Sequence, residues 1–317
     1  MQDVLDFDAI RAAARRIEGK VRRTPVLRCP ELEAELGGEI HFKCENFQEM
    51  GAFKLRGASN AVLSLPEASL QKGVATHSSG NHGSALALAA RRRGVKACVV
   101  MPDNASAYKK RAVAEYGAEI IYCTPTQAGR EQALAEYVAK TGASVVHPYN
   151  DPAVMAGQGT AALELHEQSP DLDLVMAPLG GGGLLSGTAV ATRALRPLAK
   201  VYGAEPLGAD DAWRSLKAGH IEPVAHPDTV ADGLRATIGT LTFAVLREEM
   251  DDVVRVEEQD ILDAMRYVWE RMKIVIEPSA AVPVAALRRG LVPVRGLRAG
   301  IILSGGNVDL DQLKWSL

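Results

Sequence analysis

Short apolar runs alternate with longer helical patterns along most of the chain. The runs are continuous rather than alternating with polar residues, which is typical of strands covered by helices on both faces. This criterion predicts strands at residues 39–43, 73–76, 97–101, 119–122, 144–147, 174–178, 200–204 and 300–304. The patterns between them predict helices at 83–93, 107–116, 127–141, 157–167, 183–195, 258–272 and 280–289. Such repetition predicts an α/β fold with open, mainly parallel sheets.

The length of 317 residues suggests two domains, because a single core rarely grows beyond about 250–300 residues. One complete strand–helix series runs from residue 72 to residue 147, and the turn-rich sequence HPYNDP begins at its end. We therefore expect two sheets. A small mobile α/β domain over 72–147 is predicted to be inserted into a large domain formed by 1–71 and 148–317.

The composition excludes several classes of protein. Hydrophobic residues make up 47% and charged residues 24%, unlike disordered, collagenous or disulfide-scaffold chains. The 36 basic and 39 acidic residues leave no positive excess for binding nucleic acid. The four cysteines have no metal-ligand spacing, and no apolar run approaches the roughly 20 residues that span a bilayer. We expect a cytoplasmic protein with no nucleic-acid or membrane partner, whose cysteines are small buried hydrophobes.

Four segments place small or polar residues just after a predicted strand. They are residues 78–83, 180–184, 205–211 and 304–307. In open α/β sheets ligands bind at this edge, because loop amides and helix N-termini converge there. These segments are therefore the candidates for a functional site.

The second segment contains four consecutive glycines, at 180–183, and then opens a helical pattern. Glycine lets successive backbone amides approach a single anion. The spacing matches neither the dinucleotide fingerprint nor the P-loop, so the run favours one phosphate rather than NAD or ATP. The alternative is a flexible connector.

Lys54 lies in the sequence KCENFQEMGAFKLRGA, after a glycine turn and at the start of a helical pattern. Apolar surroundings and a helix N-terminus disfavour an ammonium, which makes the amine available to attack an aldehyde. An isolated lysine is usually a solvated surface group. Its occurrence together with a loop for one phosphate favours pyridoxal phosphate, which needs both.

The segments KCENFQEMGAFKLRGA, SSGNHG, GGGGLLSG and SGGN, in this order, resemble the fold-type II pyridoxal-phosphate enzymes, which have a tryptophan synthase β-like fold. Within them the chain is most similar to the serine racemase and serine/threonine dehydratase family, over essentially its whole length. ADDAW, ADG and EPSAA support this placement.

The resemblance implies a dehydratase, or ammonia-lyase, that converts a β-hydroxy-α-amino acid into a 2-oxo acid and ammonia. We expect 3-hydroxyaspartate as the preferred substrate, followed by serine and threonine. One alternative is a serine or aspartate racemase with side dehydratase activity. Another is a non-catalytic ligand-binding protein on the same fold. The resemblance also implies a homodimer.

The resemblance assigns cofactor roles to particular residues. Lys54 would hold the cofactor's aldehyde covalently and, once released, act as base on the substrate's Cα proton. Asn81 would donate to the phenolic oxygen, Phe53 would pack beside the ring, and Ser304 would face the pyridine nitrogen. A hydroxyl there does not hold the nitrogen protonated, so the ring is a weaker electron sink. The phosphate would lie on the amides of Gly180, Gly181, Gly182, Gly183 and Leu184.

Substrate roles are implied for two regions. The loop from Ser78 to His82, including Asn81, would bind the α-carboxylate. Ser79 would work on the opposite face of Cα, or serve as a helix cap or carboxylate binder. Arg130, with His82 beside it, would face the far end of the substrate. Arginine pairs bidentately with carboxylates, which favours 3-hydroxyaspartate. The alternative for Arg130 is a solvated helix start.

A divalent-cation site is also implied by the resemblance. Its ligands would be the carboxylates of Glu205 and Asp211 and the carbonyl of Ala209. These hard oxygen donors suit Mg²⁺, Ca²⁺ or Mn²⁺ rather than zinc. The alternative is a solvated acidic loop.

Overall fold

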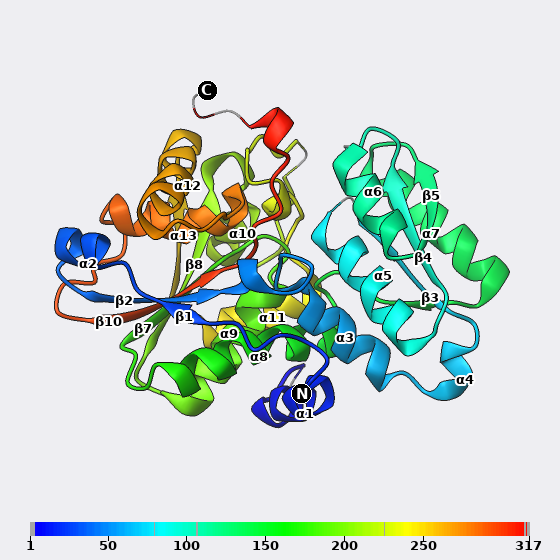
Figure 1. Ribbon diagram of the computed structural model, residues 1–317, viewed down its shortest axis with the longest axis horizontal. Helices are drawn as coiled ribbons and strands as arrows, with labels where there is room; N and C mark the ends of the chain where they lie inside the picture. The colour runs from blue at the N-terminus through cyan, green and yellow to red at the C-terminus, as the bar shows by residue number, and fades with distance from the viewer. Residues whose placement is uncertain (1–3, 79, 106, 225, 314, 316–317) are drawn as a thin grey trace.

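Two separate sheets, each flanked by helices, form the core of the protein in a computed structural model (Figure 1). The structure describes residues 4–78, 80–105, 107–224, 226–313 and 315. The larger sheet has the strand order β1-β2-β10-β7-β8-β9, and the smaller sheet has the order β5-β4-β3-β6. Among the described strands, every pair is parallel except β1 with β2. The predicted α/β fold with two mainly parallel sheets is therefore confirmed.

The strands of the larger sheet are β1 (Val26–Leu27), β2 (Glu39–Cys44), β7 (Leu174–Pro178), β8 (Lys200–Pro206), β9 (Asp252–Val256) and β10 (Arg298–Leu303). Those of the smaller sheet are β3 (Val74–His77), β4 (Ala97–Pro102), β5 (Glu119–Cys123) and β6 (Ser144–Val145). The helices are α1 (Phe7–Ile17), α2 (Pro30–Leu36), α3 (Lys54–Ser64), α4 (Glu67–Leu70), α5 (Asn81–Arg93), α6 (Ala107–Glu115), α7 (Gln127–Thr141), α8 (Pro152–Gln168), α9 (Gly183–Leu195), α10 (Asp211–Ala218), α11 (Thr240–Glu249), α12 (Glu258–Met272) and α13 (Pro278–Arg288). Short 3₁₀ turns include η2 (Leu207–Ala209) and η3 (Asp232–Leu234).

All eight predicted strands are present, but two further strands belong to the larger sheet. β1 has only two residues, too few for any sequence pattern. β9 lies at the sheet edge with a partly exposed face, so it lacks a continuous apolar run. β6 is shorter than its predicted 144–147, because the side chain of His147 accepts hydrogen bonds from the amides that follow and ends the extended conformation.

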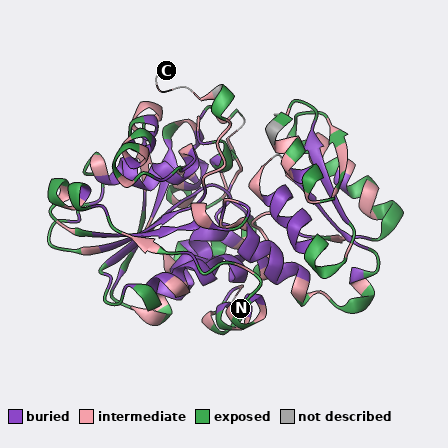
Figure 2. Ribbon diagram, viewed as in Figure 1, coloured by how far each residue is buried: buried purple, intermediate pink, exposed green. Residues whose placement is uncertain are grey.

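Helices cover both faces of the larger sheet. Side chains of α12 and α13 fill one face, and side chains of α1, α8, α9 and α11 fill the other. Figure 2 shows buried residues concentrated in the strands and in these central helices. In the described part of the chain, no helix combines the length and hydropathy that crossing a membrane requires.

Helix α3 lies between the two sheets and packs on both α5 and α8 (Figure 1). Close approach is possible because glycines face each other: a Cβ on Gly157 of α8 would lie 2.6 Å from the Cα of Gly57 in α3. A Cβ on Gly187 of α9 would lie 2.5 Å from the backbone nitrogen of Gly159 in α8. The smaller sheet falls within residues 72–147, while the division of the chain into a large and a small mobile domain stays a prediction.

Candidate active site

The segment before α3 is attached to the carboxyl end of β10. The amide of Phe53 donates to the carbonyl of Ser304 at 3.0 Å, and the amide of Gly306 donates to the carbonyl of Gly51 at 2.8 Å. Ala52 and Gly305 form an isolated antiparallel bridge between these two bonds. The two sequence motifs around Lys54 and Ser304, about 250 residues apart in the chain, are thereby brought together at the carboxyl edge of the larger sheet.

Lys54 is the first residue of α3, and its side chain is partly buried. Its Nζ donates to the carbonyl of Pro148 at 2.8 Å and lies 5.0 Å from the centre of the Phe53 ring. Burial lowers the pKa of the amine from 10.5 to about 8, although the charge of Glu277 opposes this shift. A fraction of the amine is therefore neutral near pH 7–8, as nucleophilic attack on an aldehyde requires.

A buried ionic network fixes the start of α3. The guanidinium of Arg56, two residues after Lys54, donates to both carboxylate oxygens of Glu45 and to both of Glu164, each at 2.8 Å. Lys43 also donates to Glu164, at 2.6 Å. Burial alone would raise the pKa of Glu45, but the charge of Arg56 overcomes this and lowers it. Sequence reasoning assigned no role to this network, since its partners come from distant segments.

The four-glycine run forms a tight bend before α9. Gly182 has a φ of +91°, which glycine adopts without strain. A Cβ on Gly181 would lie 2.4 Å from the ring of Tyr149, and a Cβ on Gly180 would lie 2.8 Å from the Cα of Leu234. Thr242 also donates to the carbonyl of Gly181 at 2.7 Å. The bend is therefore packed on all sides and is not a flexible connector.

The backbone amides of this bend lack acceptors. Residues 180–184 are buried, yet within the described residues their N–H groups donate no hydrogen bond. Buried amides without partners are rare, because each buried N–H that forms no hydrogen bond costs about 1–3 kcal/mol. A row of such amides at the N-terminus of a 13-residue helix fits a single phosphate group.

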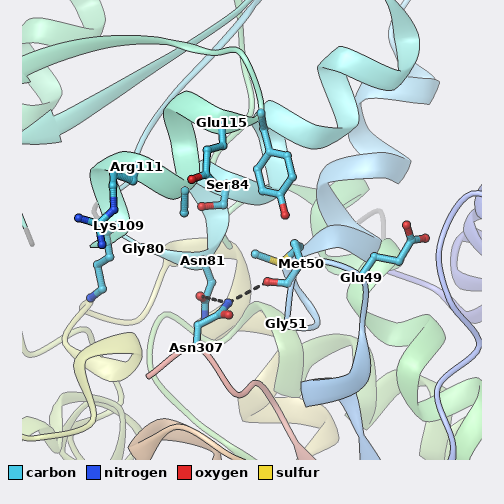
Figure 3. A pocket seen from close by; sticks show the side chains of 12 residues that line it. Glu49, Met50, Gly51, Gly80, Asn81, Ser84, Lys109, Arg111, Glu115 and Asn307 are labelled. Atoms are coloured by element: carbon cyan, nitrogen blue, oxygen red, sulfur yellow. Dashed lines mark hydrogen bonds between the residues drawn. The ribbon is translucent and has the colours of Figure 1, made fainter. Parts of the chain in front are cut away.

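Asn81 lies at the N-terminus of α5 and faces a buried carboxyl group. Its Nδ2 donates to the two oxygens of Glu277 at 2.9 and 3.1 Å. Its Oδ1 accepts from Asn307 at 2.9 Å (Figure 3). Asn307 also donates to the carbonyl of Met50 at 2.9 Å. Burial, with the charge of Asp232, raises the pKa of Glu277 to about 7. Glu277 belongs to the EPSAA motif, but sequence reasoning gave it no role.

A pocket of about 460 Å³ opens beside Asn81 (Figure 3). Lys54 is not among its lining residues. Its lining comprises Glu49, Met50, Gly51, Gly80, Asn81, Ser84, Lys109, Arg111, Ala112, Glu115, Tyr116 and Asn307.

The residues predicted to bind substrate are only partly brought together. Ser78 is half-buried, and its Oγ accepts from the amide of Gly80 at 3.2 Å. His82 is buried, and its Nε2 lies 3.0 Å from the carbonyl oxygen of Val146. Arg130 lies in the first turn of α7. Ser79 lies outside the described residues. The substrate roles of these side chains stay predictions.

The predicted cation ligands are buried next to the start of α10. The carboxylate of Glu205, in β8, accepts from the amides of Ala212 and Trp213 in α10 at 3.2 and 2.8 Å. Asp211 accepts from the amide of Ile238 at 2.8 Å. Burial raises the pKa of Asp211 to about 6 and that of Glu205 well above its usual value. The loop is therefore not a solvated acidic loop.

Among the described residues, no cationic side chain forms an ion pair with Glu205 or Asp211, although the charge of Arg214 partly opposes the rise in the pKa of Asp211. The neighbouring arginines, Arg214 and Arg255, both pair with Asp210 at 2.9 and 2.8 Å. Ala209, whose carbonyl completes the predicted set, is buried in η2. The described residues contain no cluster of three His, Cys, Asp or Glu side chains, so a cation here would depend on two carboxylates and backbone oxygen. Such donors fit a hard divalent cation.

These features define a class of site. A partly buried amine of lowered pKa is suited to an aldehyde, and a row of unpartnered amides is suited to a phosphate. Their common location at the carboxyl edge of a parallel sheet is that of an α/β enzyme using pyridoxal phosphate.

Comparison with known proteins gives the same result. Residues 17–305 match the model of the family described as "Pyridoxal-phosphate dependent enzyme". The chain is 48% identical to beta-hydroxyaspartate dehydratase of Paracoccus denitrificans (strain Pd 1222), over 98% of each chain. It is 47% identical to serine racemase of Dictyostelium discoideum, over 96% of this chain and 95% of that one. The structure of maize serine racemase aligns with a TM-score of 0.95 and 44% identity, covering 97% and 95%.

The chain therefore belongs to the family of pyridoxal-phosphate dependent enzymes, and pyridoxal phosphate is its cofactor. The predicted resemblance to serine racemases and hydroxy amino acid dehydratases is confirmed.

The lowered pKa of Lys54 predicts a pH-dependent stability change in the cofactor-free protein. The unfolded chain binds the lysine proton up to about pH 10.5, and the folded protein only up to about pH 8. This penalty on folding is complete below pH 8 and disappears as the pH rises toward 10.5. Lys54→Met should therefore raise Tm at pH 7 by about 2–5 °C, and the gain should shrink above pH 8.

Thermal melts of the cofactor-free proteins between pH 6.5 and 10 measure this effect. Lys140→Met, at an exposed position of α7, controls for the loss of a surface charge. A gain for Lys54→Met that does not change with pH would contradict the shifted pKa.

Proposed function

We propose that the protein is a dehydratase that converts 3-hydroxyaspartate into oxaloacetate and ammonia, with serine and threonine as poorer substrates. The observation that best supports this proposal is that the amine of Lys54 lies at the same edge of the larger sheet as the unpartnered amides of residues 180–184. The similarity to the Paracoccus enzyme named for β-hydroxyaspartate supports the choice of substrate.

The proposed chemistry begins with the cofactor, which when bound supplies an electron-accepting ring that acidifies the substrate's Cα–H. Lys54 then takes that proton. A base whose pKa is about 8 suits this role near neutral pH. The protonated Lys54 would then give its proton to the β-hydroxyl, which leaves as water. The remaining enamine is hydrolysed by water to the 2-oxo acid and ammonia.

Two polar groups of this chain tune the site. Ser304 is buried at the end of β10 and carries no charge, so it does not force a proton onto a ring nitrogen beside it. Hydrogen bonds with Glu277 and Asn307 fix the orientation of the side-chain amide of Asn81. The uncharged Ser304 favours prompt expulsion of a β-substituent over reactions that need a long-lived carbanion.

Substrate binding in this proposal follows the predicted loops. Ser78, Ser79, Asn81 and His82 would hold the α-carboxylate through the turn that opens α5. Arg130 would pair with the carboxylate at the far end of the substrate. A dicarboxylic hydroxy amino acid then gains one ion pair that serine and threonine lack.

A second candidate function is racemisation of serine or aspartate at the same site. The 47% sequence identity to the Dictyostelium serine racemase supports this function. The two functions differ in product: a racemase returns the amino acid with inverted Cα, whereas a dehydratase releases a 2-oxo acid.

The dehydratase proposal predicts release of a 2-oxo acid from 3-hydroxyaspartate at a higher kcat/KM than from serine or threonine. Lys54→Ala should lower that rate by about 10³-fold or more, because both the cofactor link and the base are lost. It should also abolish the yellow colour of the purified protein. The assay uses both diastereomers of 3-hydroxyaspartate, with chiral chromatography of the remaining amino acid. Inversion without 2-oxo acid release would refute the dehydratase and support the racemase.

We also propose a divalent-cation site, for Mg²⁺, Ca²⁺ or Mn²⁺, at Glu205, Asp211 and the carbonyl of Ala209. The support is the burial of two neighbouring carboxyl groups, which raises the pKa of both, and neither forms an ion pair with a described cationic side chain. A cation would ionise both and tie β8 to α10.

This site predicts a metal-dependent melting temperature. Mg²⁺, Ca²⁺ or Mn²⁺ added after EDTA treatment should raise the Tm of the wild type. Glu205→Gln replaces one of the two oxygens that accept from the amides of Ala212 and Trp213 with an NH₂ group, which cannot accept. In EDTA this variant should therefore melt below the wild type, and it should gain nothing from the ions. Asp210→Asn, which removes a neighbouring carboxylate outside the set, should keep the gain. A wild type indifferent to all three ions would rule the site out.

We further propose that the protein acts in the cytoplasm as a homodimer. The four cysteines are unpaired, which supports a reducing compartment. The dimer is supported only by the family resemblance. Light scattering of the purified holoenzyme is expected to give twice the chain mass, and a monomer at micromolar concentration would contradict it.

A further inference from the structure

Two imidazoles meet at the carboxyl edge of the smaller sheet. His77 is the last residue of β3, and His147 follows β6 by two residues. The two strands are parallel with Ala75 opposite Val145, and the amide of Val146 donates to the carbonyl of Ala75 at 2.9 Å. This register brings His77 and His147 side by side, and their rings meet edge to face with centroids 5.6 Å apart.

His147 has a defined tautomer next to the reacting amine. Its Nδ1 accepts from the backbone amides of Tyr149 and Asn150 at 3.3 and 2.9 Å. Burial lowers the pKa of His147 to about 4, so the ring is neutral at pH 7 and carries its hydrogen on Nε2. The next residue, Pro148, accepts the hydrogen bond from Lys54. The pair of imidazoles is therefore anchored beside the active amine.

The ring nitrogens of His77 have no hydrogen-bond partner among the described residues. The residue is only 9% exposed, and within the described part of the chain its ring nitrogens form no hydrogen bond. Burial lowers its pKa, the positive charge of Arg130 lowers it further, and the charge of Glu131 opposes the shift. A buried imidazole whose nitrogens lack hydrogen bonds, under the electrostatic influence of a guanidinium, is the arrangement expected where an anionic ligand completes the hydrogen bonding.

His82, which sequence reasoning placed beside Arg130, is differently engaged. Its Nε2 contacts the carbonyl oxygen of Val146, and burial lowers its pKa well below the usual value. Its Nε2 therefore donates to the backbone of the smaller sheet. Of these three histidines, His77 is the one whose ring nitrogens have no partner among the described residues.

We propose that His77, held against His147, binds the far carboxylate of the substrate together with Arg130 and so sets the preference for a dicarboxylic hydroxy amino acid over serine. This inference rests on the proposed function and deepens it. The neutral ring donates one N–H to a carboxylate oxygen, and Arg130 supplies the charge. Because serine lacks that carboxylate, its binding does not draw on His77.

The test compares His77→Asn with the wild-type holoenzyme. The ratio of kcat/KM for 3-hydroxyaspartate to that for L-serine should fall by about 10- to 30-fold, the loss expected from one hydrogen bond to a charged group. Calorimetry supplies a readout independent of turnover: affinity for malate should fall by a similar factor, and affinity for lactate by less than about 3-fold. The matched control is His220→Asn, which replaces an exposed histidine just after α10.

Equal losses for malate and lactate, or for both amino acids, would assign His77 a purely structural role and overturn the inference. Unchanged malate affinity would overturn it as well. His77→Gln replaces His77→Asn if the first variant melts earlier than the wild type or loses the cofactor's absorbance. If the wild type releases no 2-oxo acid from any hydroxy amino acid while the variant still loses malate selectively, the proposed function fails and the His77 site stands.

Discussion

The contact on which the active site depends most is the fork between Arg56 and two buried carboxylates, Glu45 and Glu164. It joins three parts of the chain: the segment after β2, the first turn of α3 and the middle of α8. Removing one partner from such a buried group costs about 3–5 kcal/mol, because the remaining charge is left uncompensated. Since Lys54 lies two residues before Arg56, the same fork that stabilises the helix also fixes the direction of the amine.

Around this fixed amine, polar groups of the cofactor site lack hydrogen-bond partners or contact with solvent. The amides of 180–184 are buried without acceptors, and Lys54 is desolvated enough to hold its pKa near 8. Each of these states is unfavourable in the empty protein, and pyridoxal phosphate bound as we propose, with its phosphate on these amides and its aldehyde on Lys54, would relieve both. Part of the binding energy of the cofactor is thus stored in the folded chain before it binds.

Much of this arrangement can be predicted from the sequence where the determinants are local. β7 matches its predicted span of 174–178, because a fully buried central strand reads as one continuous apolar run. The start of α8 is five residues earlier than predicted, since the Asp151 cap and the proline after it mark the helix more strongly than the later apolar pattern. Lys54 and the glycine bend were predictable because each is defined by a short motif.

Contacts between residues far apart in the sequence could not be predicted, because no local motif marks them. Glu277 reaches Asn81 across nearly 200 residues of sequence, and His77 meets His147 only because β3 and β6 pair in register. The engagement of His82 with the backbone of Val146 is likewise invisible in the motif SSGNHG. Composition and spacing identify which residue types are present at a sheet edge, but only the packed strands decide which of them face one another.

The position of α3 has a mechanical consequence. This helix touches α5 on one side and α8 on the other, with glycine-to-glycine contact toward α8. Lys54 is the first residue of this helix, so the reacting nitrogen is attached to the element that contacts both halves of the molecule. If the smaller sheet rotated about this contact, as predicted for a mobile domain, Lys54 would move less than the strands of that sheet.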